Sequence, residues 1–160
     1  MKPRFWKLSM GIGTSKDFKN VLEVLDFVRQ GVVLVHKDTS SPGTSKIPQG
    51  ENFVRPERTG DYFYLCHGNE SPGIILLGQF SGPANVLTVR GDGWAERPFR
   101  WIMTATTTRK YDGPQKWWSP NDNTTFIEVP DAEVAMFEEM ILIPYFGLRL
   151  SAFRFSLDDR

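Results

Sequence analysis

Short apolar runs recur along the chain and predict its strands. Successive side chains of a strand point to opposite faces, and β-branched and aromatic residues favour this conformation. Runs of this kind, bounded by glycine, proline and polar turn residues, lie at residues 5–10, 32–36, 62–66, 74–80 and 99–104. The pattern therefore predicts five strands.

Apolar positions spaced by three and four residues predict two helices. The first covers residues 18–28, with Ser15 or Asp17 as candidate N-cap and Gly31 as the glycine that follows its last turn. The second begins at an N-cap aspartate and ends at a proline, over residues 131–144. Polar segments rich in glycine, serine and threonine are expected to form loops.

Mostly β structure with two helices predicts an α+β fold. We expect a curved, mostly antiparallel sheet of five to six strands, or a partly open barrel, with flanking helices. Residues 1–160 contain no repeat and no internal boundary, which predicts a single domain. Residues 148–155 alternate and are expected to form a last strand or a linker, and residues 147–160 are the candidate linker toward a further domain.

The charged residues are distributed unevenly, although the formal net charge is zero. Residues 1–116 carry 16 Lys/Arg and 11 Asp/Glu, whereas residues 117–160 carry three and eight. A basic body with an acidic C-terminal segment can present a local basic face to nucleic acid. Chance unevenness of solvated faces explains the same counts equally well.

Motifs for catalysis and for cofactor binding are absent. The glycines at Gly11 and Gly13 lack the third glycine and the Lys-Ser/Thr pair of a phosphate-binding loop. Two histidines and one cysteine, Cys66, are too few for an ordinary zinc site. We therefore expect a binding module rather than an enzyme, with no cofactor and no metal. Cysteine usage and the absence of a membrane-spanning or signal segment fit a cytoplasmic protein.

Aromatic and basic residues in the polar segments are the candidate binding residues. An indole in a polar loop either covers the core or binds a flat ligand, and both interpretations stay open for each ring. Cations on the same loops can reach phosphates, although each one taken alone is equally well a solubilising charge. The candidate cations for the nucleic-acid backbone are Lys46, Arg55, Arg58, Lys110 and Lys116.

Several segments resemble the EVE family of the PUA-like superfamily. They are the strand with Trp6, the segment Gln49–Val54, the Gly60-Asp61 turn, the strand at 73–78 and the segment 97–101. The segments at 116–121 and 137–146 resemble the N-terminal region of McrB-like restriction proteins. In those proteins a base-reading domain precedes a nucleotide-driven motor, and no Gly-Lys-Ser/Thr loop of such a motor occurs in this chain.

The resemblance implies a mechanism, because PUA-like readers such as the YTH domains take a modified base out of its stack and hold it between aromatic rings. Carried over by position, it places Ser9 and Met10 in one wall of the base pocket. Further pocket residues by the same resemblance, or by their place in a loop, are Asn52, Phe53, Trp94 and Trp118.

The function expected from the sequence is recognition of a modified DNA base, most simply a methylated one, by base flipping. The chain would serve as the specificity module of a modification-dependent restriction system in antiviral defence, with a fused or associated motor and nuclease as partners and no membrane. An RNA-binding PUA-like module is the alternative. A small-ligand or protein-interaction domain and a nucleotide-directed enzyme also stay open.

Overall fold

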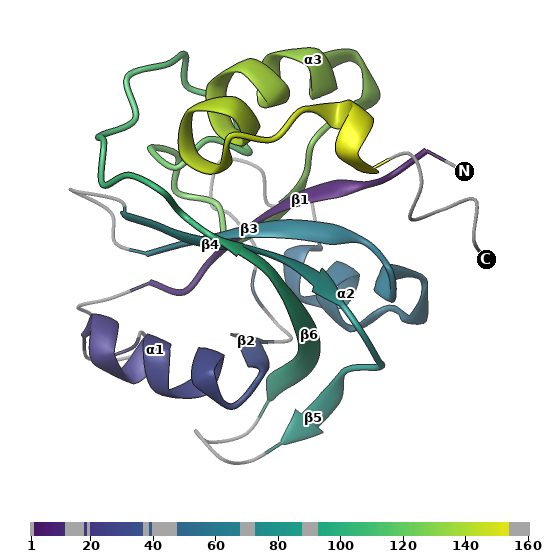
Figure 1. The fold of residues 1–160 in the computed structure, drawn as a ribbon. Helices are drawn as coiled ribbons and strands as arrows, with labels where there is room; N and C mark the ends of the chain where they lie inside the picture. The colour runs from purple at the N-terminus through teal and green to yellow at the C-terminus, as the bar shows by residue number, and fades with distance from the viewer. Residues whose placement is uncertain are drawn as a thin grey trace.

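The computed structural model of the chain describes residues 2–11, 18, 20–36, 39, 48–67, 73–87 and 93–153. Figure 1 shows a curved sheet with helices on both sides. Among the described residues, seven strands form one sheet in the order β2-β6-β4-β3-β1-β7, with β5 paired to the first half of β6. The strands are β1 (Phe5–Ser9), β2 (Val32–His36), β3 (Tyr62–His67), β4 (Gly73–Phe80), β5 (Asn85–Leu87), β6 (Trp94–Thr104) and β7 (Phe126–Glu128).

The sheet is mixed, because β1 runs parallel to β3 while the other pairs are antiparallel. It curls into a half-barrel, so the predicted α+β class with a curved, mostly antiparallel sheet is confirmed at that level. The five predicted strands are present. The two strands that the pattern missed, β5 and β7, have three residues each, too few to show a period.

Both faces of the central strands are buried, each in its own hydrophobic core. Along β1, Phe5 packs into one core and Trp6 into the other, and along β3 Tyr62 and Phe63 alternate in the same way. Figure 1 shows α1 and α2 on one side of the sheet and the C-terminal helices on the other. Burial on two faces explains why these strands are apolar almost throughout, as strands covered on both sides are.

The helical segments are shorter and less regular than the pattern predicts. They are α1 (Val21–Arg29), α2 (Gln49–Val54), α3 (Val134–Phe137), the 3₁₀ turns η2 (Pro56–Arg58), η3 (Asp131–Glu133) and η5 (Leu150–Phe153), and the π-helix η4 (Glu138–Phe146).

The first predicted helix starts later than expected. Asn20 caps α1 by accepting a hydrogen bond from the Glu23 amide at 3.0 Å. The predicted caps, Ser15 and Asp17, lie outside the described residues. Gly31 follows the helix with φ 82°, in the left-handed region that favours glycine, so this part of the prediction is confirmed.

The second predicted helix does not end at Pro144. Asp131 opens a 3₁₀ turn, α3 follows, and the chain continues as the π-helix η4 with Pro144 inside it. A proline removes one N–H donor and crowds the carbonyl of the preceding turn, and a π-helical turn, with its longer hydrogen-bonded ring, relieves that crowding. The segment ends instead at Gly147, whose φ is 66°.

The last strand expected from the alternation over residues 148–155 is wrong for residues 148–153. Leu150–Phe153 form a 3₁₀ turn, and Phe153 is buried. The Phe153 ring lies edge-on to Phe5 at 5.0 Å and to Tyr62 at 4.8 Å between centroids. This stretch is therefore part of the domain, and residues 154–160 lie outside the described part of the chain.

Candidate functional site

Trp94 lies on a strand rather than in the loop that the sequence suggests. It is the first residue of β6, opposite His36 of β2 in the antiparallel register. The first residues of β6 could not be recognised as a strand from the sequence, because the polar residues Glu96 and Arg97 interrupt its apolar pattern. The indole of Trp94 is half-buried, so part of its surface is open to solvent.

Two aromatic side chains hold the Trp94 indole edge-on. The rings of Phe18 and His36 lie 5.6 Å and 5.4 Å from it, with interplanar angles of 68° and 84°. We call Phe18, His36 and Trp94 the Trp94 cluster. The sequence did not assign Phe18 or His36 to a site, because a lone histidine at a strand end and an aromatic on a helix face are both ordinary core residues.

The Trp94 cluster is joined to the end of β1. The amide of Phe18 donates to the carbonyl of Gly11 at 2.8 Å, and the amide of Met10 donates to Cys66 O at 3.0 Å. Met10 is buried in the core, whereas Ser9 is partly exposed. Successive residues of β1 point to opposite faces, so the Ser9 hydroxyl faces the core that contains Cys66, to which it is hydrogen-bonded, and not the core against which Trp94 packs. Neither of the two residues expected in this wall therefore offers its side chain to a ligand at Trp94.

The predicted pair Asn52 and Phe53 separates into one accessible residue and one core residue. Phe53 is fully buried, with its ring edge-on to Phe126 at 5.3 Å and to Phe80 at 5.9 Å. Asn52 is partly exposed on α2. The buried Gln49 fixes this helix, because its Oε1 accepts from the amides of residues 125 and 126 at 2.7 Å and 2.9 Å. The Phe53 ring therefore supports the site from within the core and has no face left for a base.

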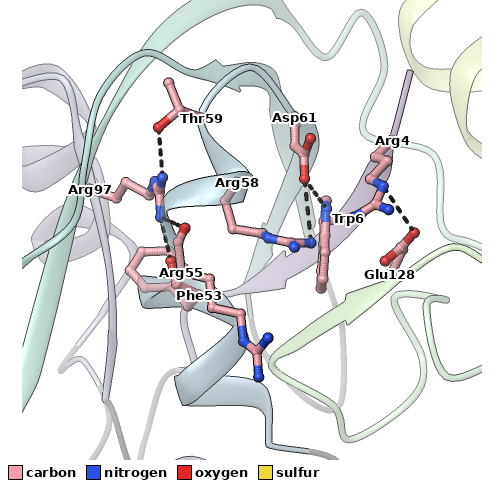
Figure 2. A network of polar contacts seen from close by, with 9 residues as sticks. All are labelled: Arg4, Trp6, Phe53, Arg55, Arg58, Thr59, Asp61, Arg97 and Glu128. Carbon is pink, nitrogen blue, oxygen red and sulfur yellow. Dashed lines mark hydrogen bonds and ion pairs between the residues drawn. The ribbon is translucent and has the colours of Figure 1, made fainter. Parts of the chain in front are cut away.

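Arg58 is a buried member of a polar network rather than a free surface cation. Only 6% of Arg58 is exposed, and its Nη1 lies 3.5 Å from Asp61 Oδ2. Its guanidinium lies over the Trp6 ring, 4.6 Å from the centroid. Trp6 Nε1 donates to the same Asp61 oxygen at 3.0 Å, as Figure 2 shows. Arg58 is thus unavailable to a phosphate.

Arg97 fastens the segment between α2 and β3 to the sheet. Its Nη1 donates to the carbonyls of Phe53 and Arg55, each at 2.8 Å, and its Nη2 donates to Thr59 Oγ1 at 2.9 Å. The side chain of Arg55 points away from this network in Figure 2 and is exposed. Arg55 therefore keeps the role of a candidate phosphate contact.

The two adjacent tryptophans at 117 and 118 have opposite environments. Trp118 is buried edge-on against Phe137, with 5.6 Å between centroids, and its Nε1 donates to Glu133 Oε1 at 3.0 Å. Trp117 is 52% exposed. Trp118 is therefore a core residue and not part of a base pocket.

The remaining predicted cations differ in their exposure to solvent and in whether an acidic side chain pairs with them. Lys110 is exposed. Lys116 is partly exposed, and its Nζ lies 3.7 Å from Glu133 Oε1, so part of its charge is neutralised. Lys46 lies outside the described residues.

A separate groove of about 410 Å³ lies between the 109–114 segment and the π-helix η4. Its lining includes Tyr111 and Tyr145, and burial raises the pKa of Tyr111 to about 12. Arg109 on its rim pairs with Asp112 at 3.3 Å. None of the residues predicted for the base pocket lies in this groove.

Within the described ranges, no three His, Cys, Asp or Glu side chains come together as metal ligands. No helix in the same ranges has the length and apolar character needed to span a bilayer.

Neither a protein-family model nor a curated protein sequence matches the chain. Among solved structures, protein PSPTO5229 from Pseudomonas syringae is similar over 83% of this chain and 96% of its own, with a TM-score of 0.51 and 13% identity. A hypothetical protein from Leishmania major is similar over 86% and 94%, with a TM-score of 0.47 and 11% identity. At such low identity, what this chain shares with the Pseudomonas syringae protein is its fold, a curved mixed sheet flanked by helices.

Proposed function

We propose that the chain binds nucleic acid and recognises a modified DNA base, flipped out of its stack, against the indole of Trp94. The observation that carries the proposal is the Trp94 cluster. A partly exposed indole is fixed edge-on by two rings, beside the residues that follow β1. A ring held in place by neighbours loses little conformational freedom when a flat ligand stacks on it.

The energies involved allow such a mechanism. Taking a base out of the duplex costs a few kcal/mol, and stacking on an aromatic side chain returns about 1–3 kcal/mol per base. Burying one methyl group adds roughly 0.8 kcal/mol. Hydrogen bonds to the base edge must supply the rest. Among the predicted pocket residues Asn52 is a partly exposed polar group, whereas the Ser9 hydroxyl is hydrogen-bonded to Cys66 on the other face of the sheet. Met10 and Phe53 lie in the core against which Trp94 packs, whereas Trp118 lies in the core on the other face of the sheet.

Electrostatic attraction to phosphates is assigned to exposed cations. Arg55 and Lys110 are exposed among the predicted backbone contacts. Each phosphate contact made by such a side chain releases a counterion, so binding should weaken as salt is raised. Arg58 is excluded from this role because it is buried against Trp6 and Asp61.

The test is a set of short duplexes and single strands that carry one 5-methylcytosine, one 5-hydroxymethylcytosine, one N6-methyladenine or no modification, with RNA strands of the same sequence. The wild-type protein should prefer one modified DNA at least about tenfold over the plain sequence, a difference of roughly 1.4 kcal/mol. Trp94→Ala should remove this preference, and Trp94→Phe should keep part of it because it keeps a ring.

Trp101→Ala is the matched control, since Trp101 is also exposed, at 41%, and lies on the same strand. It should keep the preference of the wild type. Equal affinity of the wild-type protein for modified and plain DNA refutes the proposal. A preference for RNA over DNA of the same sequence favours the RNA-binding alternative instead.

We also propose that the protein supplies specificity to a modification-dependent restriction system. This part depends on the sequence resemblance at 116–121 and 137–146. It predicts that the protein directs a separate or fused motor and nuclease to modified DNA.

A further inference from the structure

The groove between the 109–114 segment and the π-helix η4 has the size and the lining of a small-molecule site. Its volume of about 410 Å³ falls in the range of such sites, which combine apolar walls with a few polar groups. The apolar part of its lining consists of Tyr111, Pro114, Met140, Pro144 and Tyr145. None of the residues assigned to base recognition lines the groove, so a ligand here is independent of the proposed DNA contact.

Tyr145 brings a hydroxyl without a hydrogen-bond partner to this groove. Only 2% of Tyr145 is exposed, and its backbone carbonyl accepts from the amide and the hydroxyl of Thr106 at 2.8 Å and 3.1 Å. Within the described part of the chain, no hydrogen bond reaches its side-chain hydroxyl. A buried polar group that lacks a partner is costly, so this hydroxyl marks a place where a ligand can complete the bonding.

Tyr111 adds a second hydroxyl beside the first. Its hydroxyl donates to the carbonyl of Pro114 at 2.7 Å and can still accept a hydrogen bond. Burial, together with the neighbouring Tyr145, raises the pKa of Tyr111 to about 12. Burial also raises the pKa of Tyr145, which Arg109 lowers and Asp112 raises from the groove lining. Both groups are therefore neutral hydroxyls at neutral pH, and Tyr145 can donate as well as accept.

The walls of the groove are held in place before a ligand arrives. A Cβ at Gly113 would lie 2.6 Å from the Tyr111 hydroxyl and 2.9 Å from Met140 Sδ, so the 109–114 backbone packs closely on both walls. Such fixed walls reduce the conformational entropy that a ligand must overcome.

The charges of the lining favour a cation. Arg109 Nη2 lies 3.3 Å from Asp112 Oδ1, so these two charges largely cancel. Glu139 is exposed and forms no ion pair with any residue that the structure describes. With one arginine and two carboxylates, the lining has a net charge of one negative unit. This balance disfavours phosphate-bearing ligands and leaves the Glu139 carboxylate for a positive group.

We propose that the groove binds a small organic cation, an amine or an amidine attached to a flat apolar body. The apolar body packs against Met140, Pro144 and the tyrosine rings, and aromatic faces also attract cations. The positive group pairs with the Glu139 carboxylate. One of its N–H groups donates to the Tyr145 hydroxyl, which gains the partner that it lacks.

The experiment uses three probes of nearly the same shape and different charge. They are benzamidine, which is a cation, benzamide, which is neutral, and benzoate, which is an anion, with phenethylamine as a second cation. Each is titrated into the full-length protein at neutral pH and low salt, and amide shifts are followed by NMR. Saturable shifts are expected at residues 109–113 and 139–145 with both cations. Benzamidine should bind at least about threefold more tightly than benzamide, the effect of one exposed charge pair, and benzoate should bind least.

Three variants separate the contributions of charge and hydrogen bonding. Glu139→Gln should weaken benzamidine about threefold and leave benzamide unchanged. Arg109→Gln should strengthen benzamidine, because Asp112 then adds an unpaired negative charge. Tyr145→Phe should weaken benzamidine and benzamide alike, since it removes a hydrogen bond to either probe. Asp131→Asn is the control, because Asp131 is an exposed acid outside the groove lining, and it should bind as wild type. Thermal melting checks that each variant is folded.

Several results overturn the proposal. Saturable binding of neither cation, or binding of benzoate as tight as that of benzamidine, excludes a cation site. Shifts confined to residues outside the groove place the ligand elsewhere. Equal loss of benzamidine binding in Glu139→Gln and Asp131→Asn reduces the effect to general surface charge. An unchanged affinity of Tyr145→Phe for both probes removes the hydroxyl from the site. None of these results bears on the recognition of a modified base at Trp94.

Discussion

Replacing Asp61 with asparagine tests whether the network around Trp6 contains a carboxylate that resists ionisation. Asp61 is 9% exposed and accepts from Trp6 Nε1 at 3.0 Å, with Arg58 Nη1 at 3.5 Å. Burial raises the pKa of Asp61 from its ordinary 3.8 to about 6, and the Trp6 hydrogen bond and the Arg58 charge oppose that rise only in part. Asparagine keeps an oxygen for Trp6 and removes the titration.

The sign of the pH effect follows from the direction of the shift. A carboxyl whose pKa is higher in the folded than in the unfolded state takes up a proton on folding, so acid favours the folded state through this group. The contribution is complete below about pH 3.8 and is lost as the pH rises through about 6. With about 1.36 kcal/mol per pKa unit, it amounts to about 2 kcal/mol between about pH 7 and pH 4.5.

The measurement is urea unfolding of wild type and Asp61→Asn at several pH values across this range. The stability of wild type relative to Asp61→Asn should increase by about 2 kcal/mol as the pH falls to about 4.5. Subtracting the two curves removes the titration of all other groups. Asp26→Asn is the control, because Asp26 is an exposed residue in a surface ion pair with Arg29.

Two outcomes contradict this reasoning. Parallel curves for wild type and Asp61→Asn would mean that Asp61 titrates alike in the folded and unfolded states. A wild-type advantage that shrinks in acid would mean that the Arg58 charge outweighs burial and lowers the pKa.

Two further variants test the assignments of buried residues. Phe53→Ala should destabilise the protein by about 3–5 kcal/mol, because a fully buried ring is removed, whereas Phe53→Leu should cost much less; a small loss in urea unfolding for Phe53→Ala would return this ring to the candidate site. Lys7→Met should lower stability by about 1–3 kcal/mol and speed amide exchange at residues 116–125, because Asp122 O and Thr124 Oγ1 lose a donor. Unchanged exchange in that loop would show that Lys7 does not brace it.

Much of the fold could be predicted from the sequence because its longer elements have clear patterns. The strands at β2, β3 and β4 are continuous apolar runs, and α1 has a helical period that ends at a glycine. The three-residue strand β7 could not be recognised, since its partner β1 is distant in sequence. The continuation of the helix beyond Pro144 was not predicted, because local helix propensities do not indicate where a π-helix forms.

The candidate site could be predicted only in part, because the sequence does not show which side of an element a ring faces. Trp117 and Trp118 are neighbours with the same side chain, yet only one is exposed. Arg58 is predicted from the sequence as a surface cation, and Arg97 is given no role there; both are buried against aromatic rings. Burial of this kind depends on tertiary partners such as Asp61 and the carbonyls of α2, which no local pattern reveals.

The pairing of β1 with β7 has a consequence for how the chain folds. Trp6 is paired in register with Glu128, so the first strand of the chain cannot complete its ladder until the chain beyond residue 128 has been synthesised. Contacts this distant in sequence slow folding, because a long loop must close before they form. During synthesis on the ribosome, one edge of β1 therefore stays unpaired until β7 has emerged. Fragments that end before residue 126 should aggregate through that unpaired edge.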